Sequence, residues 1–220
     1  MTPRFHPCGS GAFLMDVSAG AFDLGTQKRL WSLAAGESPV RAIAGVRSLL
    51  LGVNNLLVRF DALRADPREL HALIGAAWEA AQPLEAGGKS FEVAVTYDTA
   101  PGSELEVIAA QAGLSVAEAI RLHSGADYHV ACIGSVPGFA YLVGLPPELA
   151  TPRRQTPSAR VHKGSVVIGG AQAGVIPMDM PSGWHVLGRT ELAMFDPLRD
   201  PPSLFAPGDR VRFTVRGGTP

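Results

Sequence analysis

Two stretches in the first part of the chain place apolar residues three and four positions apart, which is the period of an amphipathic helix. They span residues 23–35 and 66–81. The second is the clearer, because Asp66 can cap the helix and Pro67 suits the first helical position. The residues expected to face a core are Leu70, Leu73, Ile74 and Ala77.

Strand patterns flank these helices. Residues 11–17 look like a short strand, and residues 89–97 alternate between apolar and polar side chains. Between the helices, 40–53 reads as strand, turn and strand, and 55–61 continues the extended pattern. The order is close to strand–helix–strand–strand–helix–strand. It predicts an α+β chain whose first domain, residues 1–90, is a ferredoxin-like unit.

The pattern changes in the rest of the chain. Residues 103–113 and 115–125 read as two helices, and the second opens with a capping box formed by Ser115 and Glu118. From residue 127 onward, short strand-like runs are separated by Gly and Pro. Such punctuation is typical of a β-barrel or a β-sandwich. We therefore expect a second domain over 91–220, made of a helical linker and a β domain.

No charged residue occurs from Val130 to Pro147. That window is nearly as long as a membrane span, but its prolines and glycines are incompatible with a continuous helix. Within it, Pro137-Gly138 predicts a tight turn, since Pro presets one position and Gly permits the next. We expect Phe139, Tyr141 and Leu142 to fold back after the turn and cover the barrel or line a cleft.

Composition excludes some partners. The formal net charge is −1, so the chain has no overall field that would attract nucleic acid or an anionic membrane. Cys8 and Cys132 lie far apart and form no CxxC pair, which fits a reducing cytosol without structural disulfides. The N-terminal residues lack the pattern of a signal peptide. We expect a cytoplasmic protein.

One segment has an unusual charge pattern. Between Glu148 and Asp179 every formal charge is positive, with His162 among the cations Arg153, Arg154, Arg160 and Lys163. The segment is either a solvated basic loop or an anion-binding rim for a carboxylate or phosphate, which Arg binds with a two-pronged donor.

Other candidate side chains also allow two interpretations. His123, at the end of a predicted helix, is either a cation that the helix C-terminus favours or a residue of proton transfer or substrate binding. Trp184 is either core or a platform for a ligand. The carboxylates Asp127 and Asp179 have no recognisable partner in the sequence, so no catalytic dyad can be read from it.

Several common motifs are absent. "GGKS" at 87–90 resembles the end of a phosphate-binding loop, but Pro83 replaces the required Gly and a strand follows instead of a helix. The sequence contains no G-x-S-x-G elbow. The six histidines show no metal-ligand spacing, so we expect no metal site in this chain.

Residues 123–190 resemble a known family. The combination of "PGFAYL", "ATPRR", the "GSV" strand and "GWHVLGRT" is similar to the signature of the family formed by the B subunits of 5-oxoprolinase. This family is also called KipI-like or allophanate hydrolase subunit 1, and corresponds to carboxyltransferase subdomain C/D. The resemblance implies an N-terminal α+β lobe and a C-terminal cyclophilin-like β-barrel.

The resemblance also implies an activity. Together with a C-type partner, which is a homologue of subunit 2, and an A-type subunit, such a chain would take part in the ATP-dependent opening of a small amide or lactam such as 5-oxoproline. ATP would be used by the assembled complex. Carried over residue by residue, the family's pattern marks His123 as catalytic. The substrate-binding positions it marks are Tyr128, Pro137, Gly138, Phe139, Tyr141, Arg153, Arg154, Gln172, Trp184 and Arg189.

The chain departs from the family pattern at two positions. Ile176 stands where the family usually has Tyr, so any hydroxyl contact at that position is lost. Lys163 is a cation where the family often has Ala.

Two alternative functions remain open at this point. One is a KipI-like inhibitor of a histidine kinase, and the other is a component of a biotin-dependent urea carboxylase-type carboxyltransferase. This chain has no Met-Lys biotinylation context, so the second would need a carrier on another chain.

Overall fold

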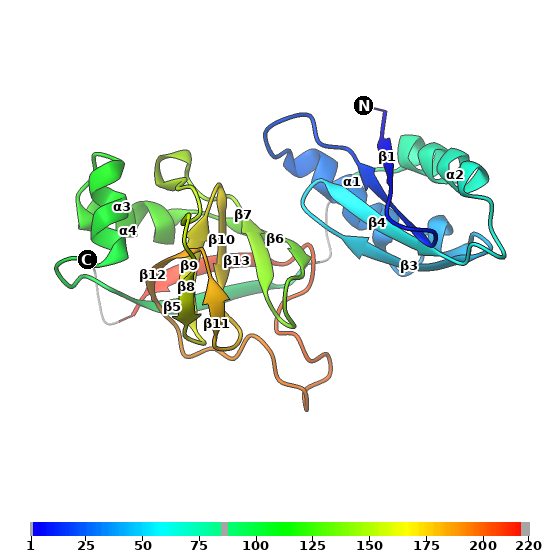
Figure 1. The fold of residues 1–220 in the computed structure, drawn as a ribbon. Coiled ribbons are helices and arrows are strands. Elements are labelled where there is room, and N and C mark those ends of the chain that lie inside the picture. The colour runs from blue at the N-terminus through cyan, green and yellow to red at the C-terminus, as the bar shows by residue number, and fades with distance from the viewer. Residues whose placement is uncertain (1, 85–87, 217–220) are drawn as a thin grey trace. The chain divides into compact units, whose positions relative to one another are not determined.

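The computed structural model describes residues 2–84 and 88–216. The chain divides into two compact units, Met1–Gly87 and Gly88–Pro220. Each has its own sheet (Figure 1), and each has its own hydrophobic core. The expected class, α+β, is confirmed. The strand expected at 89–97 does not complete the first lobe, because it pairs within the second unit.

The first unit is a four-stranded antiparallel sheet with two α-helices. In spatial order the strands are β1 (Arg4–Pro7), β2 (Ala12–Asp16), β4 (Asn55–Phe60) and β3 (Val46–Leu51). The helices are α1 (Leu24–Ala34), the short 3₁₀ helix η1 (Pro39–Ala42) and α2 (Pro67–Ala80). Along the chain the order is therefore β-β-α-β-β-α, so the expected order of elements, strand–helix–strand–strand–helix–strand, is wrong.

Two local details of this unit also differ from the prediction. Residues 39–42 form η1 instead of a strand, because Pro39 fixes the first helical φ and the hydroxyl of Ser38 caps the turn. On α2 the buried residues are Leu70, Ile74 and Trp78, which lie four apart, whereas Leu73 is 44% exposed. The expected cap is confirmed, since the carboxylate of Asp66 accepts from the backbone N–H of Arg68 at 2.8 Å.

The second unit is a closed seven-stranded β-barrel (Figure 1). Around the barrel the strands are β10 (Gln172–Val175), β7 (Ala140–Val143), β6 (Tyr128–Ile133), β13 (Arg210–Val215), β5 (Ser90–Tyr97), β12 (His185–Arg189) and β9 (Ser165–Gly169). Strands β13 and β5 run parallel, and the other neighbours in the barrel are antiparallel. Closure pairs the edge strands that an open sheet would leave unpaired.

Further elements lie outside the barrel wall. Strands β8 (Ser158–Val161) and β11 (Met180–Ser182) form a separate two-stranded ribbon. Helices α3 (Glu104–Gln111) and α4 (Val116–Gly125) contact β12 and β13 respectively, and η2 (Pro147–Leu149) is a 3₁₀ turn. The capping box expected at the start of α4 is confirmed, with Ser115 and Glu118 bonded reciprocally. Within the described ranges, no helix has the length and apolarity needed to cross a membrane.

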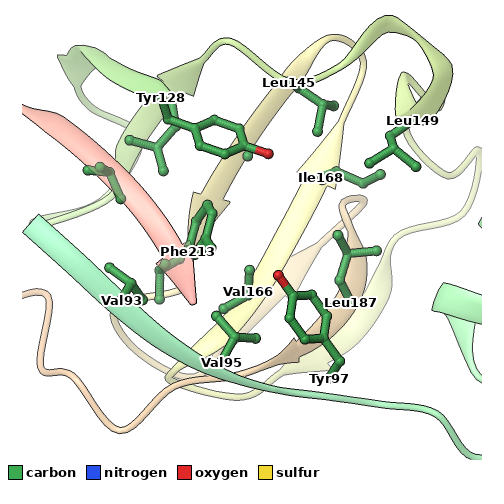
Figure 2. Packing of buried hydrophobic residues seen from close by; sticks show 14 of the residues in the cluster. Val93, Val95, Tyr97, Tyr128, Leu145, Leu149, Val166, Ile168, Leu187 and Phe213 are labelled. Atoms are coloured by element: carbon green, nitrogen blue, oxygen red, sulfur yellow. The ribbon is translucent and has the colours of Figure 1, made fainter. Parts of the chain in front are cut away.

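The barrel interior is filled with apolar side chains. Figure 2 shows aliphatic residues of several strands packed around Phe213, Tyr97 and Tyr128, with both tyrosine hydroxyls directed into the interior. Both hydroxyls reach His123 of α4: that of Tyr97 lies 2.7 Å from its Nδ1, and that of Tyr128 donates to its carbonyl oxygen at 3.0 Å. The barrel is therefore a packed core, and any site has to lie at its ends or outside its wall.

Candidate functional site

The uncharged segment makes the expected tight turn. The backbone N–H of Phe139 donates to the carbonyl of Val136 at 3.1 Å, which closes a four-residue turn around Pro137 and Gly138. Gly138 has a φ of +80°. Proline at the second position and a positive φ at the third are the features of a type II turn. Directly after the turn, β7 enters the barrel wall, so the predicted turn is confirmed. Leu142, which was expected to cover the barrel or line a cleft, is instead buried in the barrel core.

Three aromatic rings meet beside this turn. Phe139 contacts Tyr141 edge-on at 5.0 Å between ring centroids and Trp184 at 5.3 Å. Tyr141 and Trp184 are 6.0 Å apart. Gly169 and Gly174 leave the space that the rings occupy, because a Cβ at these positions would lie 2.8 Å from Trp184 and 2.9 Å from Phe139. The positions of Phe139 and Trp184 therefore require glycine at residues 169 and 174.

A pocket of about 280 Å³ opens at this aromatic cluster. It lies outside the barrel wall, within the second unit, between the turn before β7, the loop before β8 and the segment from β11 to β12. It is lined by Ser135, Phe139, Tyr141, Arg153, Arg154, Pro157, Ile176, Met180, Pro181, Ser182, Gly183 and Trp184.

Arg153 is the cation with the greatest freedom in this pocket. Its guanidinium carbon lies 5.0 Å from the centroid of the Trp184 ring, within cation–π range. Among the described residues, none of its nitrogens lies within 4.0 Å of a carboxylate oxygen. Because Trp184 is 7% exposed and already packed in the cluster, it serves both as core and as a platform under Arg153.

Arg154 is held in place by a carboxylate. Its guanidinium pairs with one oxygen of Glu104, at the start of α3, and the other oxygen accepts from the backbone N–H of Val186 at 2.7 Å. The backbone N–H of Arg154 donates to the carbonyl of Gly183 at 2.8 Å. These contacts fix the loop against β12 and offset the charge of Arg154, so Arg153 carries the charge available to a ligand.

The rest of the basic segment is only partly available to an anion. Arg160 donates to Asp179 at 2.5 and 2.9 Å, which is a partner that the sequence did not reveal. The Lys163 backbone N–H and then the Arg160 guanidinium lower the pKa of Asp179 to about 2. Asp127 likewise pairs with Arg212 at 2.7 Å. A continuous basic rim is therefore not present.

His123 lies in the barrel core and not at the pocket. Its side chain is completely buried, stacked on Phe213 with 4.5 Å between ring centroids. Burial lowers its pKa to about 3, so the imidazole is neutral at physiological pH. The interpretation as a helix-terminal cation is therefore wrong. The catalytic role stays a prediction, and it does not match this placement in the core.

The other predicted site residues divide by location. Phe139, Tyr141, Arg153, Arg154 and Trp184 come together at the pocket. Pro137 and Gly138 form the turn that leads to it. Tyr128 is fully buried in the barrel core. Gln172 begins β10 between Val143 and Gly169, and Arg189 lines a different pocket.

Sequence reasoning missed several lining residues. Ile176 appeared only as a departure from the family pattern, yet it is 1% exposed and forms an apolar wall of the pocket. Ser182 and Gly183 directly precede Trp184 in the same sequence motif, which was the signal for them. Glu104 lies 50 positions from Arg154 in the sequence, and no local pattern announces that pair.

The pocket provides mainly binding groups, and the Tyr141 phenol is the lining group best suited to proton transfer. Its described lining contains two guanidinium groups, a phenol and two serine hydroxyls, but no carboxylate, imidazole, thiol or amine. Groups of at least three His, Cys, Asp or Glu side chains able to hold a metal ion do not occur in the described part of the chain. The pocket is suited to hold a small ligand with an anionic group and a compact apolar body.

Known proteins resemble the chain over nearly its whole length. A relative, the B subunit of 5-oxoprolinase from Escherichia coli O157:H7, is 41% identical over 215 residues, covering 96% of this chain and 94% of that protein. The crystal structure of TTHA0988 matches with a TM-score of 0.76 at 32% identity, covering 95% of this chain and 41% of TTHA0988. This chain therefore spans about two fifths of that protein.

A structural likeness to a more distant protein supports the fold, and a family model identifies the family. The urea amidolyase of K. lactis matches with a TM-score of 0.81 at 19% identity, covering 97% of this chain and 15% of that one. The family model described as carboxyltransferase domain, subdomain C and D, matches residues 3–205. The chain belongs to the carboxyltransferase domain family, subdomain C and D.

Proposed function

We propose that this chain is the B subunit of a 5-oxoprolinase-type complex. Assembled with a C-type partner and an A-type subunit, it takes part in the ATP-dependent opening of 5-oxoproline to glutamate. In this reaction the lactam C–N bond breaks, one water supplies the second oxygen of the new carboxylate and the hydrogen on nitrogen, and a second water is consumed as ATP becomes ADP and phosphate. ATP is used by the assembled complex, and no residue of this chain is assigned to it.

One observation carries the proposal: Arg153 lies over Trp184 beside an apolar wall. The substrate is a small five-membered ring with one carboxylate. Arg153 would bind the carboxylate with two parallel hydrogen bonds, while Trp184 and Ile176 would contact the ring. The pocket, of about 280 Å³, is in proportion to such a ligand. The relative from E. coli is named as the B subunit of 5-oxoprolinase.

The lining of the pocket also supports the proposal that the chain acts with a partner. General acid–base catalysis requires side chains that exchange protons, and besides the Tyr141 phenol the described lining offers no carboxylate or imidazole for this. The chain would therefore bind and orient the substrate, and the groups that move protons would come from a partner protein of the complex.

Reconstitution tests the proposal. The chain is mixed with the A and C subunits of the same organism, ATP and 5-oxoproline, and glutamate and ADP are measured. With Arg153→Ala the KM for 5-oxoproline should rise about tenfold or more, because a charge-assisted hydrogen bond is lost. The kcat should change less, since Arg153 binds the carboxylate in the ground state and the transition state alike.

Arg160→Ala is the matched control. Arg160 belongs to the same basic segment, but it pairs with Asp179 and does not line the pocket. The KM of the complex with Arg160→Ala for 5-oxoproline should stay near that of the complex with the unmodified chain. If the three proteins form a complex but produce no glutamate, the proposed reaction is wrong. If Arg153→Ala and Arg160→Ala raised the KM equally, the pocket at Trp184 would not be the site that binds 5-oxoproline.

A further inference from the structure

A second pocket, of about 580 Å³, lies beside strands β5 and β12 of the barrel. It is lined by Thr96, Tyr97, Asp98, Lys163, Val186, Gly188, Arg189, Thr190, Glu191 and Arg216. None of these residues lines the pocket at Trp184. Two cations singled out in the sequence, Lys163 and Arg189, meet here, although they lie 26 positions apart in the chain.

Positive charge prevails in this second pocket. The lining holds three cationic and two anionic side chains. Glu191 is engaged by Arg216 at 2.6 Å, and the carboxylate of Asp98 accepts from the backbone N–H of Ala100 at 3.2 Å. By contrast, among residues 2–84 and 88–216 no carboxylate oxygen lies within 4.0 Å of the Lys163 amine or the Arg189 guanidinium. Both cations are exposed and available to a ligand.

The backbone fixes the positions of these two residues. The N–H of Thr190 donates to the carbonyl of Gly164 at 2.8 Å, which ties the turn after Lys163 to the end of β12. The backbone N–H of Lys163 donates to Asp179 at 2.8 Å. On the β12 side, Gly188 packs so closely on β5 that a Cβ would lie 2.5 Å from the carbonyl oxygen of Thr96. The two side chains thus extend from firmly held segments.

We propose that this second pocket binds a small oxyanion, phosphate or carboxylate, between the Lys163 amine and the Arg189 guanidinium. The amine acts as a point charge and the guanidinium as a planar two-pronged donor, a combination suited to anionic oxygens. The side chain of Val186, also in the lining, provides an apolar contact for the rest of the molecule. The second pocket shares no lining residue with the proposed 5-oxoproline pocket, although the family resemblance counted Arg189 among the substrate-binding positions.

Titration of the full chain with inorganic phosphate tests this site. Calorimetry at neutral pH and low ionic strength should give saturable binding with a dissociation constant in about the millimolar range or tighter. In amide NMR spectra the shifts should concentrate at Gly188, Thr190 and Lys163. Lys163→Ala and Arg189→Ala should each weaken binding about tenfold, and Arg189→Lys should weaken it less, because the charge remains.

A parallel titration with succinate distinguishes a phosphate site from a carboxylate site, and binding of either anion with these variant effects supports the proposal. Arg121→Ala is the matched control: Arg121 is an exposed cation of the same unit, on α4, outside this lining. The Arg121→Ala variant should bind phosphate and succinate with the affinity of the unmodified chain. The proposal is overturned if neither anion saturates, if the shifts lie elsewhere, or if Arg121→Ala weakens binding as much as Arg189→Ala. A failure of 5-oxoprolinase activity would leave this result unaffected.

Discussion

His123 shows how a single buried residue can couple stability to pH. The imidazole Nδ1 meets the Tyr97 hydroxyl, and Nε2 has no hydrogen-bond partner among the described atoms. A charged imidazole at this position would lose its hydration without gaining a counter-charge, which is why burial lowers its pKa to about 3.

The pH dependence of unfolding should report this residue. In the unfolded chain histidine titrates near 6.5, so as pH falls the unfolded chain takes up the proton first. The contribution of His123 to stability is complete above about pH 6.5 and is lost progressively toward pH 3, with a slope of about 1.4 kcal/mol per pH unit. The free energy of unfolding, measured with denaturant at several pH values between these limits, should change less steeply with pH in His123→Gln than in the unmodified chain.

An unchanged slope in His123→Gln would contradict this prediction. If the variant does not fold, an NMR titration of the imidazole in the unmodified chain gives the same answer. A signal that titrates near 6.5 in the folded state would show that His123 is not buried as a neutral group.

Tyr141 allows packing to be separated from ligand contact. Its ring touches Phe139 and Trp184, and the residue lines the pocket. Tyr141→Phe keeps the ring and removes only the hydroxyl. We expect an unchanged melting temperature, because the apolar contacts remain, and a several-fold lower kcat/KM of the assembled complex. Equal kcat/KM values for the two proteins would mean that the hydroxyl has no role in the reaction.

At the scale of elements, the turn before β7 depends on Gly138. Its φ of +80° strains any other residue, and an added Cβ would lie 2.6 Å from the Cβ of Phe195. Gly138→Ala should therefore destabilise the chain by about 2–4 kcal/mol, through backbone strain and overpacking together. Gly102 is the matched control, with a φ of +79° and nothing within 4 Å of an added Cβ.

Gly102→Ala should cost only the backbone strain, about 1 kcal/mol. Urea unfolding of the two variants at one pH measures the difference. If both variants lose the same free energy of unfolding, the contact with Phe195 does not contribute and the turn is less closely packed than the structure indicates.

The elements that sequence reasoning predicted well are those with local causes. Helix α2 begins where Asp66 caps it, and α4 begins at the Ser115–Glu118 capping box, because both interactions join residues within a few positions of each other. Residues 39–42 were misjudged because a buried Val40 fits a strand as well as a 3₁₀ turn. Periodicity cannot separate the two in so short a segment.

At the scale of the whole molecule, the chain consists of two units with separate cores. The buried residues of the first unit form one cluster, and those of the barrel unit form two others. Both candidate pockets lie within the second unit. The separate fragment 88–220 should therefore fold cooperatively and bind phosphate with the affinity of the full chain.

Circular dichroism melting and the phosphate titration of the fragment check this expectation. A broad, non-cooperative melt would show that the barrel requires the first unit to fold. A cooperative melt with clearly weaker phosphate binding would place part of that site outside residues 88–220.

The sequence by itself determined the class of the fold and most of the helices and strands, because periodicity and caps act over a few residues. It also marked the residues of the aromatic pocket, since Phe139, Tyr141, Arg153 and Trp184 lie in motifs with a recognisable pattern. Tertiary structure decided which predicted residues share a site. The packing of the second unit buried His123 and Tyr128, paired Arg154 with Glu104, and placed Lys163 and Arg189 in one pocket. These outcomes depend on contacts between distant segments, and local sequence does not encode such distances.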